Sequence, residues 1–323
     1  MTPDRTALVL GASGGIGGEV VRRLLSQGWT VRAMHRDPDR VRRSAKAPDL
    51  VWMRGDAMNA ADVAAAAAGA AVIVHAVNPP AYRNWGELVL PMLDNTIAAA
   101  RANGARIVLP GTVYNFGPDA FPVVTEASPQ NPVTVKGRIR AEMERRLRAA
   151  SAQGASVLIV RAGDFFGPRA ASNNWFAQGL VKPGKPVTAI TYPGGRGIGH
   201  QWAYLPDAAE TMVRLLDRRA TLEPFAVFHM QGHWDADGTQ MIAAIRRAIG
   251  DPRLTVRKTP WWLMRLAAPV VPLFREILEM RYLWNVPLRM DNVRLKSVLG
   301  AEPHTPLDEA VRATLVGLGC LEA

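Results

Sequence analysis

The stretch TALVLGASGGIGGEVVRRLL, residues 6–25, decides the fold. It begins with an apolar run that predicts a short buried strand over 6–12, and the run passes directly into glycines. From Ile16 onward, apolar residues recur at helical spacing, which predicts a helix over 16–28. A glycine turn between a strand and a helix is typical of a site that binds a pyrophosphate at the helix N-terminus.

The glycines of this turn have distinct steric roles. Gly11 permits the tight turn, Gly14 lets the backbone approach a pyrophosphate, and Gly17 lets the helix pack close to the sheet. The helix then presents free N–H groups and its positive dipole end to the phosphates. We therefore expect the turn to bind a dinucleotide cofactor through Gly11, Ser13, Gly14, Gly15, Ile16 and Gly17.

Strands and helices alternate through the residues that follow. Apolar runs predict further strands over 29–36, 50–56, 71–77, 106–113 and 156–163. Because parallel strands need crossover helices, this alternation indicates right-handed βαβ units and a sheet covered on both faces. The predicted fold class is α/β: a Rossmann-type doubly wound parallel sheet with a smaller, mostly helical C-terminal substrate lobe.

The alternation breaks after Gly163, where a segment rich in glycine, proline and polar residues begins. A predicted helix over 206–217 and a strand over 225–230 then return to the sheet. We expect two domains: a nucleotide-binding domain of residues 1–167, to which 201–230 return, and a substrate-binding lobe of 168–200 and 231–323.

The end of the second strand bears on the choice of cofactor. An NAD-selecting site usually ends this strand with an acidic residue that binds the ribose hydroxyls, whereas Met34, His35 and Arg36 stand here. The planar fork of Arg36 suits a 2′-phosphate, so we expect NADP(H) to be preferred, with NAD(H) possible. Asp56 is expected to bind the adenine amine beside Ala57, or alternatively to cap the next helix. The fourth strand ends with further expected cofactor contacts, His75, Ala76 and Val77.

These segments together resemble the extended and atypical short-chain dehydrogenase/reductase superfamily. Besides GASGGIG, the resemblance rests on the GD at 55–56, VIVHAV at 72–77, TVYNFGP at 112–118, RAGDFFGP at 161–168, HQWAYLPDAAETMVRLL at 200–216 and LKSVLGAEPHTPLDEAVRATL at 295–315. It implies NAD(P) binding and either hydride transfer or epimerase and dehydratase chemistry.

The catalytic residues depart from the family pattern. Active members of the superfamily use a Ser or Thr with a Tyr and a Lys spaced YxxxK, but none of the five tyrosines here has a lysine four residues later. Alignment on VKGRIRAEME, residues 135–144, puts Lys136 at the tyrosine position and Arg140 at the lysine position. The usual hydroxyl falls near Pro110, and Thr112 is the closest one.

One branch of the superfamily also lacks this tyrosine. Isoflavone-reductase and phenylcoumaran-ether-reductase-like enzymes carry a KxKIRRxxE helix whose first lysine is catalytic, and KGRIRAEME at 136–144 resembles it. The resemblance implies that Lys136 transfers the proton, while Thr112 or Tyr114 orients the substrate. The alternative is that Lys136 begins a solvent-exposed helix and merely binds the nicotinamide ribose, or binds nothing.

Several polar and aromatic residues are expected to face a small-molecule substrate. They are Asn78, Asp164, Phe166, His200 and Trp202. The six histidines show no HExxH motif or close pair, so no metal site is expected. The tryptophan-containing stretch over 261–274 is expected to pack the lobe over the site, with a subunit contact in a homodimer or a membrane-surface contact as alternatives.

Composition excludes several other classes. The single cysteine, Cys320, cannot form an internal disulfide, and no run of roughly 20 apolar residues predicts a transmembrane helix, so a cytoplasmic protein is expected. The net charge of +11 comes mostly from scattered arginines rather than from a basic groove interleaved with aromatics, so nucleic acid is not an expected partner.

The sequence thus favours an NADP-dependent oxidoreductase that transfers hydride to or from a small carbonyl, enone or hydroxyl substrate. Two alternatives remain: a sugar-nucleotide epimerase or dehydratase, and a non-catalytic NADP(H)-binding sensor or assembly protein.

Overall fold

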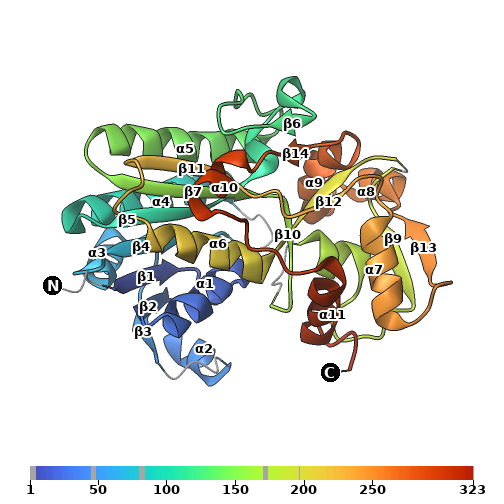
Figure 1. Ribbon diagram of the computed structural model, residues 1–323, viewed down its shortest axis with the longest axis horizontal. Helices are drawn as coiled ribbons and strands as arrows, with labels where there is room; N and C mark the ends of the chain where they lie inside the picture. The colour runs from blue at the N-terminus through green and yellow to red at the C-terminus, as the bar shows by residue number, and fades with distance from the viewer. Residues whose placement is uncertain (1–4, 45–48, 80–83, 170–173, 196, 323) are drawn as a thin grey trace.

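A seven-stranded sheet forms the centre of the molecule. The computed structural model describes residues 5–44, 49–79, 84–169, 174–195 and 197–322 (Figure 1). The strands of the sheet lie in the order β11-β7-β5-β4-β1-β2-β3, and every paired strand runs parallel to its neighbour. Their bounds are β1 Thr6–Leu10, β2 Thr30–His35, β3 Leu50–Arg54, β4 Val72–His75, β5 Arg106–Thr112, β7 Ser156–Ala162 and β11 Phe225–His229.

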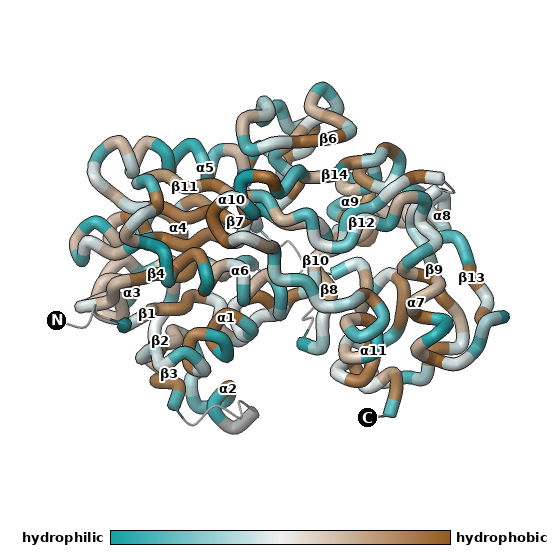
Figure 2. Tube along the Cα trace, viewed as in Figure 1, coloured by the Kyte–Doolittle hydropathy of each residue, from teal (hydrophilic) through white to brown (hydrophobic). Residues whose placement is uncertain are grey.

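Helices cover both faces of this sheet. One face carries α1 (Gly15–Ser26), α6 (Leu205–Asp217) and α10 (Val293–Leu299), and the other carries α3 (Ala60–Ala67), α4 (Trp85–Asn103) and α5 (Val135–Ala152). Successive strand residues point to opposite faces, so Ala7 and Val9 lie in one core cluster while Leu8 and Leu10 lie in the other. Figure 2 shows the hydrophobic colouring concentrated along these strands. The predicted doubly wound Rossmann-type fold is confirmed.

The chain reverses its winding direction between β1 and β4. From β1 the chain moves outward through β2 and β3, then crosses back to β4 and continues outward on the other side through β5 and β7. Ligands of such sheets bind where the order reverses, at the carboxyl ends of the strands. The glycine turn follows β1 at this point.

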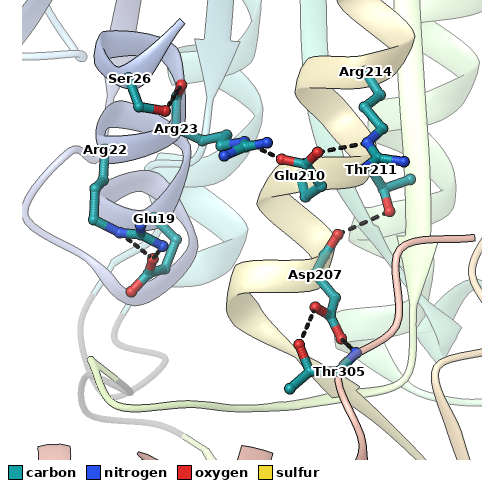
Figure 3. Close-up of polar contacts among 9 residues, drawn as sticks. All are labelled: Glu19, Arg22, Arg23, Ser26, Asp207, Glu210, Thr211, Arg214 and Thr305. Carbon is teal, nitrogen blue, oxygen red and sulfur yellow. Dashed lines mark hydrogen bonds and ion pairs between the residues drawn. The ribbon is translucent and has the colours of Figure 1, made fainter.

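Polar contacts hold α6 to its neighbours (Figure 3). Arg23 on α1 forms an ion pair with Glu210 on α6. Asp207, also on α6, accepts hydrogen bonds from the N–H of Thr305 at 2.8 Å and from its hydroxyl at 2.7 Å. The segment that contains Thr305 is therefore bound to α6, the helix that packs on α1.

The C-terminal lobe is mostly helical, as predicted, with short strands between its helices. The helices are α7 Gln240–Ile249, α8 Trp261–Ala267, α9 Pro272–Glu279 and α11 Leu307–Gly317, and α9 leads into the 3-10 turn η5, Met280–Trp284. The strands are β8 Asp164–Phe166, β9 Ala189–Tyr192, β10 His200–Tyr204, β12 His233–Asp235 and β13 Thr255–Lys258. β10 joins β8 and β12 in a small sheet. Two-residue strands, β6 Val123–Val124 and β14 Arg289–Met290, tie the lobe to the segment after β5.

The structure further describes α2 Pro38–Ser44, the 3-10 turns η2 Val113–Asn115 and η3 Pro118–Ala120, and the π-helical turn η4 Phe176–Leu180 within the lobe. Within the described residues, no helix combines the length and apolar character needed to cross a membrane.

Candidate functional site

The glycine turn lies against the end of β4 and leaves no room for side chains. Gly11 has a φ of +87°, and a Cβ on it would lie 2.4 Å from the carbonyl oxygen of Ala76. A Cβ on Gly17 would lie 2.2 Å from the carbonyl oxygen of Gly11. Atoms cannot approach so closely, so both positions require glycine. The turn is therefore clamped between the start of α1 and β4.

Within the described part of the chain, no side chain caps the N-terminus of α1. Gly14 is the N-cap residue and has no side chain to accept a hydrogen bond from the N–H groups that follow. Its own N–H donates to the carbonyl oxygen of Gly11 at 2.9 Å, which fixes the turn. Ser13 is exposed, whereas Gly15 and Ile16 are half-buried. The uncapped amides and the helix dipole suit an anion such as a diphosphate.

β2 ends at His35, and the residue that follows it is Arg36 rather than an acidic residue. Arg36 is exposed immediately after the strand, and its carbonyl oxygen accepts a hydrogen bond from Arg54 at 3.1 Å. Arg54 also pairs with Asp39 of α2. The backbone at Arg36 is thus held in place while its guanidinium remains open to solvent.

Asp56 does not cap the helix that follows it. Asn59 is the N-cap of α3, and its side chain accepts hydrogen bonds from the N–H groups of Ala61 and Asp62. Asp56 instead accepts from the N–H of Met58 at 3.0 Å, in a local turn. The capping interpretation of Asp56 is therefore wrong, and its adenine role stays a prediction. Ala57 is buried beside it.

A buried histidine closes the end of β4. His75 is 2% exposed, and its Nδ1 lies 2.8 Å from the hydroxyl of Thr96. Burial, together with the charge of Arg140, lowers the pKa of His75 to about 3, so its ring is neutral at physiological pH. Its Nε2 has no hydrogen-bond partner among the described residues. Arg140 in turn donates to the Asn78 side chain at 3.2 Å, which connects α5 to the segment after β4.

Lys136 is buried at the start of α5, in contact with the lobe. Its side chain is 2% exposed, so the interpretation of Lys136 as part of a solvent-exposed helix is wrong. Its ammonium donates to the Glu279 carboxylate at 2.5 Å and to the Glu276 carbonyl oxygen at 3.2 Å, and it forms an ion pair with the Glu276 carboxylate. The Lys136 N–H also donates to Glu279 at 3.1 Å. An ammonium has three donors and no acceptor, and this set of acceptors matches that form.

The helix that carries Lys136 is packed against the residues that follow β5. A Cβ on Gly137 would lie 2.3 Å from the carbonyl oxygen of Tyr114, so the two backbones are in close contact. The hydroxyl of Thr134 caps α5 by accepting from the Gly137 N–H at 2.9 Å. The hydroxyl of Thr112 accepts from the Tyr114 N–H at 3.4 Å. The chain thus brings Lys136, Thr112 and Tyr114 to one end of the sheet.

A second buried ion pair lies along the same helix and was not predicted from the sequence. Glu144 of α5 accepts hydrogen bonds from Arg161 at the end of β7, one of them at 2.9 Å. Arg161 also lies 2.8 Å from Nε2 of His229 on β11. Burial and the charge of Arg161 lower the pKa of His229 to about 3. The network joins α5, β7 and β11 and fixes the orientation of the helix that bears Lys136.

Of the residues predicted to face the substrate, Asp164 and His200 form a pair. Nε2 of His200 lies 2.9 Å from the Asp164 carboxylate, and its ring stacks on Trp284 with ring centroids 3.6 Å apart. Phe166 and Trp202 are 0% exposed within the aromatic core of the lobe. Trp202 packs edge-on against the His200 ring, and Phe166 packs against Trp202. Neither side chain therefore offers a surface to a substrate in this structure.

Tyr282 lies close enough to both Glu279 and Asp164 to interact with their charges. Burial raises its pKa, and the charges of Glu279 and Asp164 raise it further. Its hydroxyl donates to the carbonyl oxygen of Phe116 at 3.4 Å, and its ring stacks on Phe121. No set of three potential metal ligands occurs within the described residues.

Comparison with known proteins identifies the family. Residues 11–175, just over half of the chain, match the family described as NAD(P)H-binding. The chain belongs to this NAD(P)H-binding family. The match begins at Gly11 and spans the glycine turn, Arg36, the end of β4 and the helix of Lys136.

Two relatives of this NAD(P)H-binding protein match it over part of its length. The uncharacterized protein y4nL of Sinorhizobium fredii is 30% identical over 197 residues, which span 55% of each chain. A 3-diazoavenalumate denitrifying reductase of a Streptomyces species is 28% identical over 267 residues, covering 76% of this chain and 82% of the relative.

Solved structures share the fold over the whole chain. The UDP-glucose 4-epimerase of Bifidobacterium longum, in complex with NAD+ and UDP, is 16% identical with a TM-score of 0.73, covering 98% of this chain and 97% of its own. A putative epimerase of Burkholderia cenocepacia is 16% identical with a TM-score of 0.74, covering 99% and 100%. At such identity the likeness concerns the fold alone, and it agrees with the predicted resemblance to epimerase-like members.

The glycine turn fits the cofactor that this family binds. The uncapped α1 N-terminus would hold the diphosphate, and the absence of a side chain at Gly14 leaves its backbone accessible to it. The unpartnered Nε2 of His75 lies at the end of β4, the strand against which the turn packs.

Proposed function

We propose that the protein is an NADP-dependent oxidoreductase in which Lys136 gives a proton to, or takes one from, a small substrate. The observation that carries the proposal is the burial of this lysine among three acceptors of α9, at the end of the sheet where the glycine turn lies. A buried lysine at the position of the family's tyrosine is otherwise costly to maintain, because removing a charge from water requires compensating partners.

The exposure of Glu276 and Glu279 gives protons a route from solvent to Lys136. The side chain of Lys136 is 2% exposed, whereas those of Glu276 and Glu279 are 32% and 20% exposed. The two carboxylates therefore lie between the buried amine and water. In the reducing direction, Lys136 would give its proton to the substrate oxygen, and the carboxylates would return a proton from solvent to the amine.

The cofactor would be held by the family's turn. The N–H groups at the start of α1 would bind its diphosphate and Arg36 its 2′-phosphate, while residues 75–77 would line its nicotinamide half. When bound, the nicotinamide supplies or accepts a hydride. A charge-assisted contact from Arg36 is worth about 1.5–3 kcal/mol, which corresponds to roughly ten- to hundredfold in affinity.

The substrate would be a small carbonyl, enone or hydroxyl compound. Thr112 or Tyr114 would orient it from the end of β5, and the Asp164–His200 pair would offer it a polar contact from the lobe. The half-buried ring of Tyr282, which interacts with Asp164, favours an apolar body. An aryl diazo compound belongs in the same test set, because the Streptomyces relative is named for one.

The experiment is a cofactor titration followed by a substrate screen. NADPH and NADH are titrated by nicotinamide fluorescence, and the preferred cofactor is then followed by absorbance against carbonyl, enone, alcohol and aryl diazo substrates. We expect NADPH to bind at least about tenfold more tightly and to be consumed with one class. Tight NADPH binding without turnover of any substrate would favour a sensor or assembly role, and equal NADH binding with conversion of a UDP-sugar would favour an epimerase.

A further inference from the structure

The segment around α8 and α9 exposes an unusual concentration of large apolar side chains. Trp262, Leu266 and Val270 are 67%, 72% and 80% exposed. We call the exposed apolar residues of this segment the α8–α9 patch: Trp262, Leu263, Leu266, Val270 and Leu273. The sequence predicts that residues 261–274 pack the lobe over the site, but most of them are exposed, and Trp261 packs within the lobe. Contiguous exposed apolar residues usually mark an interaction surface.

The patch is built on a fixed base. The indole N–H of Trp261 donates to the carbonyl oxygen of Pro193 at 3.0 Å, and its ring packs on Trp175 with centroids 6.0 Å apart. The guanidinium of Arg281 lies over the same ring, 5.4 Å from its centroid. The adjacent Trp262 is held outward by this arrangement, so its exposure is not a consequence of a loose end of chain.

The charges along the chain segment that carries the patch have one sign. Residues 252–275 contain five cations and no acidic residue, namely Arg253, Arg257, Lys258, Arg265 and Arg275. All five are exposed. The first acidic residues after this segment, Glu276 and Glu279, contact Lys136 on the inner side of α9. An exposed apolar patch on a segment whose charged residues are all basic is complementary to an anionic lipid surface.

We propose that the α8–α9 patch docks the protein on an anionic membrane surface. Trp262, Leu266 and Val270 enter the boundary between headgroups and acyl chains, and the five cations contact the lipid phosphates. A second copy of the chain fits less well, because a two-fold contact would bring the two basic segments face to face. Binding at this surface does not require the reaction proposed above, so the two proposals can fail separately.

The test is flotation of the full chain with vesicles of phosphatidylcholine alone or of phosphatidylcholine mixed with phosphatidylglycerol. We expect flotation with the mixed vesicles and loss of it in high salt, which screens the charges. Trp262→Ser and Leu266→Ser should each weaken binding roughly tenfold. Arg257→Glu and Lys258→Glu should each weaken it roughly fivefold or more.

A matched control uses an exposed apolar residue elsewhere. Val293 at the start of α10 is 62% exposed, and Val293→Ser should leave flotation unchanged. Equal binding to both vesicle types, absence of binding to the mixed vesicles, or equal weakening by Val293→Ser would overturn the proposal. So would a dimer in light scattering that Trp262→Ser dissociates, because the patch would then be covered by a second copy.

Discussion

Lys136 on α5 and Glu279 on α9 meet across the boundary between the sheet and the lobe. The N–H of Lys136 donates to one carboxylate oxygen of Glu279 at 3.1 Å, and its ammonium donates to the other at 2.5 Å. One lobe residue therefore binds both the side chain of the proposed proton donor and the first turn of its helix. A shift of α9 would therefore change the hydrogen bonds of the Lys136 ammonium.

Removing the Glu279 carboxylate should loosen this boundary. Glu279→Ala deletes two hydrogen bonds, one of them charge-assisted, and leaves a buried ammonium with fewer acceptors, so the free energy of unfolding should fall by about 2–4 kcal/mol. Urea denaturation followed by circular dichroism measures this. Glu309→Ala, an exposed glutamate on α11, is the control and should change stability by less than about 0.5 kcal/mol. Equal effects of the two changes would contradict the ion pair.

Gly17 should be irreplaceable in the cofactor turn. A Cβ there would meet the carbonyl oxygen of Gly11 at 2.2 Å, so Gly17→Ala must displace either the turn or α1. We expect NADPH affinity to fall by roughly a hundredfold or more. Gly86→Ala on α4 is the control, because no atom lies within 4 Å of its Cβ position; it should keep affinity and raise stability by up to about 1 kcal/mol. Unchanged NADPH binding by Gly17→Ala would place the cofactor elsewhere.

Arg36 should discriminate between the two cofactors. Arg36→Ala is expected to weaken NADPH binding by roughly ten- to hundredfold and to leave NADH binding unchanged, since only NADPH carries the 2′-phosphate. Isothermal titration with both cofactors measures the difference. Arg312→Ala, an exposed arginine on α11, tests whether net charge alone matters. A parallel loss of NADH affinity in Arg36→Ala would mean that this side chain does not contact the 2′-phosphate.

Stability should fall on acidification below pH 6.5. His75 has a folded-state pKa lowered to about 3, by burial first and by Arg140 second, whereas an unfolded histidine titrates near ~6.5. Between these values the unfolded chain binds a proton that the folded chain does not, so each such histidine lowers the unfolding free energy by about 1.4 kcal/mol per pH unit. His229, also lowered to about 3, adds the same sign.

The variant His75→Gln separates this contribution. Its unfolding free energy should vary less steeply between pH 6.5 and pH 4, by the slope of one proton, when measured by denaturant titration at several pH values. Parallel curves for the variant and the wild type would show that folding does not lower the pKa of His75.

The sheet could be predicted from the sequence because its signals are local. Apolar runs and helical spacing locate β1, α1 and their successors, and glycine chemistry marks the turn between them. Capping is also local. Asn59, a strong N-cap residue three positions after the strand predicted over 50–56, caps α3, whereas the capping interpretation had named Asp56. The two-residue strands β6 and β14 are too short to show a periodicity.

The partners of the buried charges could not be predicted. Glu279 lies 143 positions from Lys136, and His229 lies 68 positions from Arg161. Such pairs are created by tertiary packing and leave no pattern in the neighbouring residues. The motif alignment therefore located Lys136, but only the fold reveals that α9 surrounds its ammonium with carboxylates.

The most direct test of the central claim is the effect of Lys136→Ala on turnover. With the substrate class found by screening, kcat/KM should fall by roughly 10²–10⁴-fold, while the Kd for NADPH stays unchanged. Lys182→Ala, an exposed lysine in the lobe, should retain full activity. Undiminished turnover by Lys136→Ala, in a variant that still binds NADPH, would contradict the assignment of this lysine as the proton-transfer group.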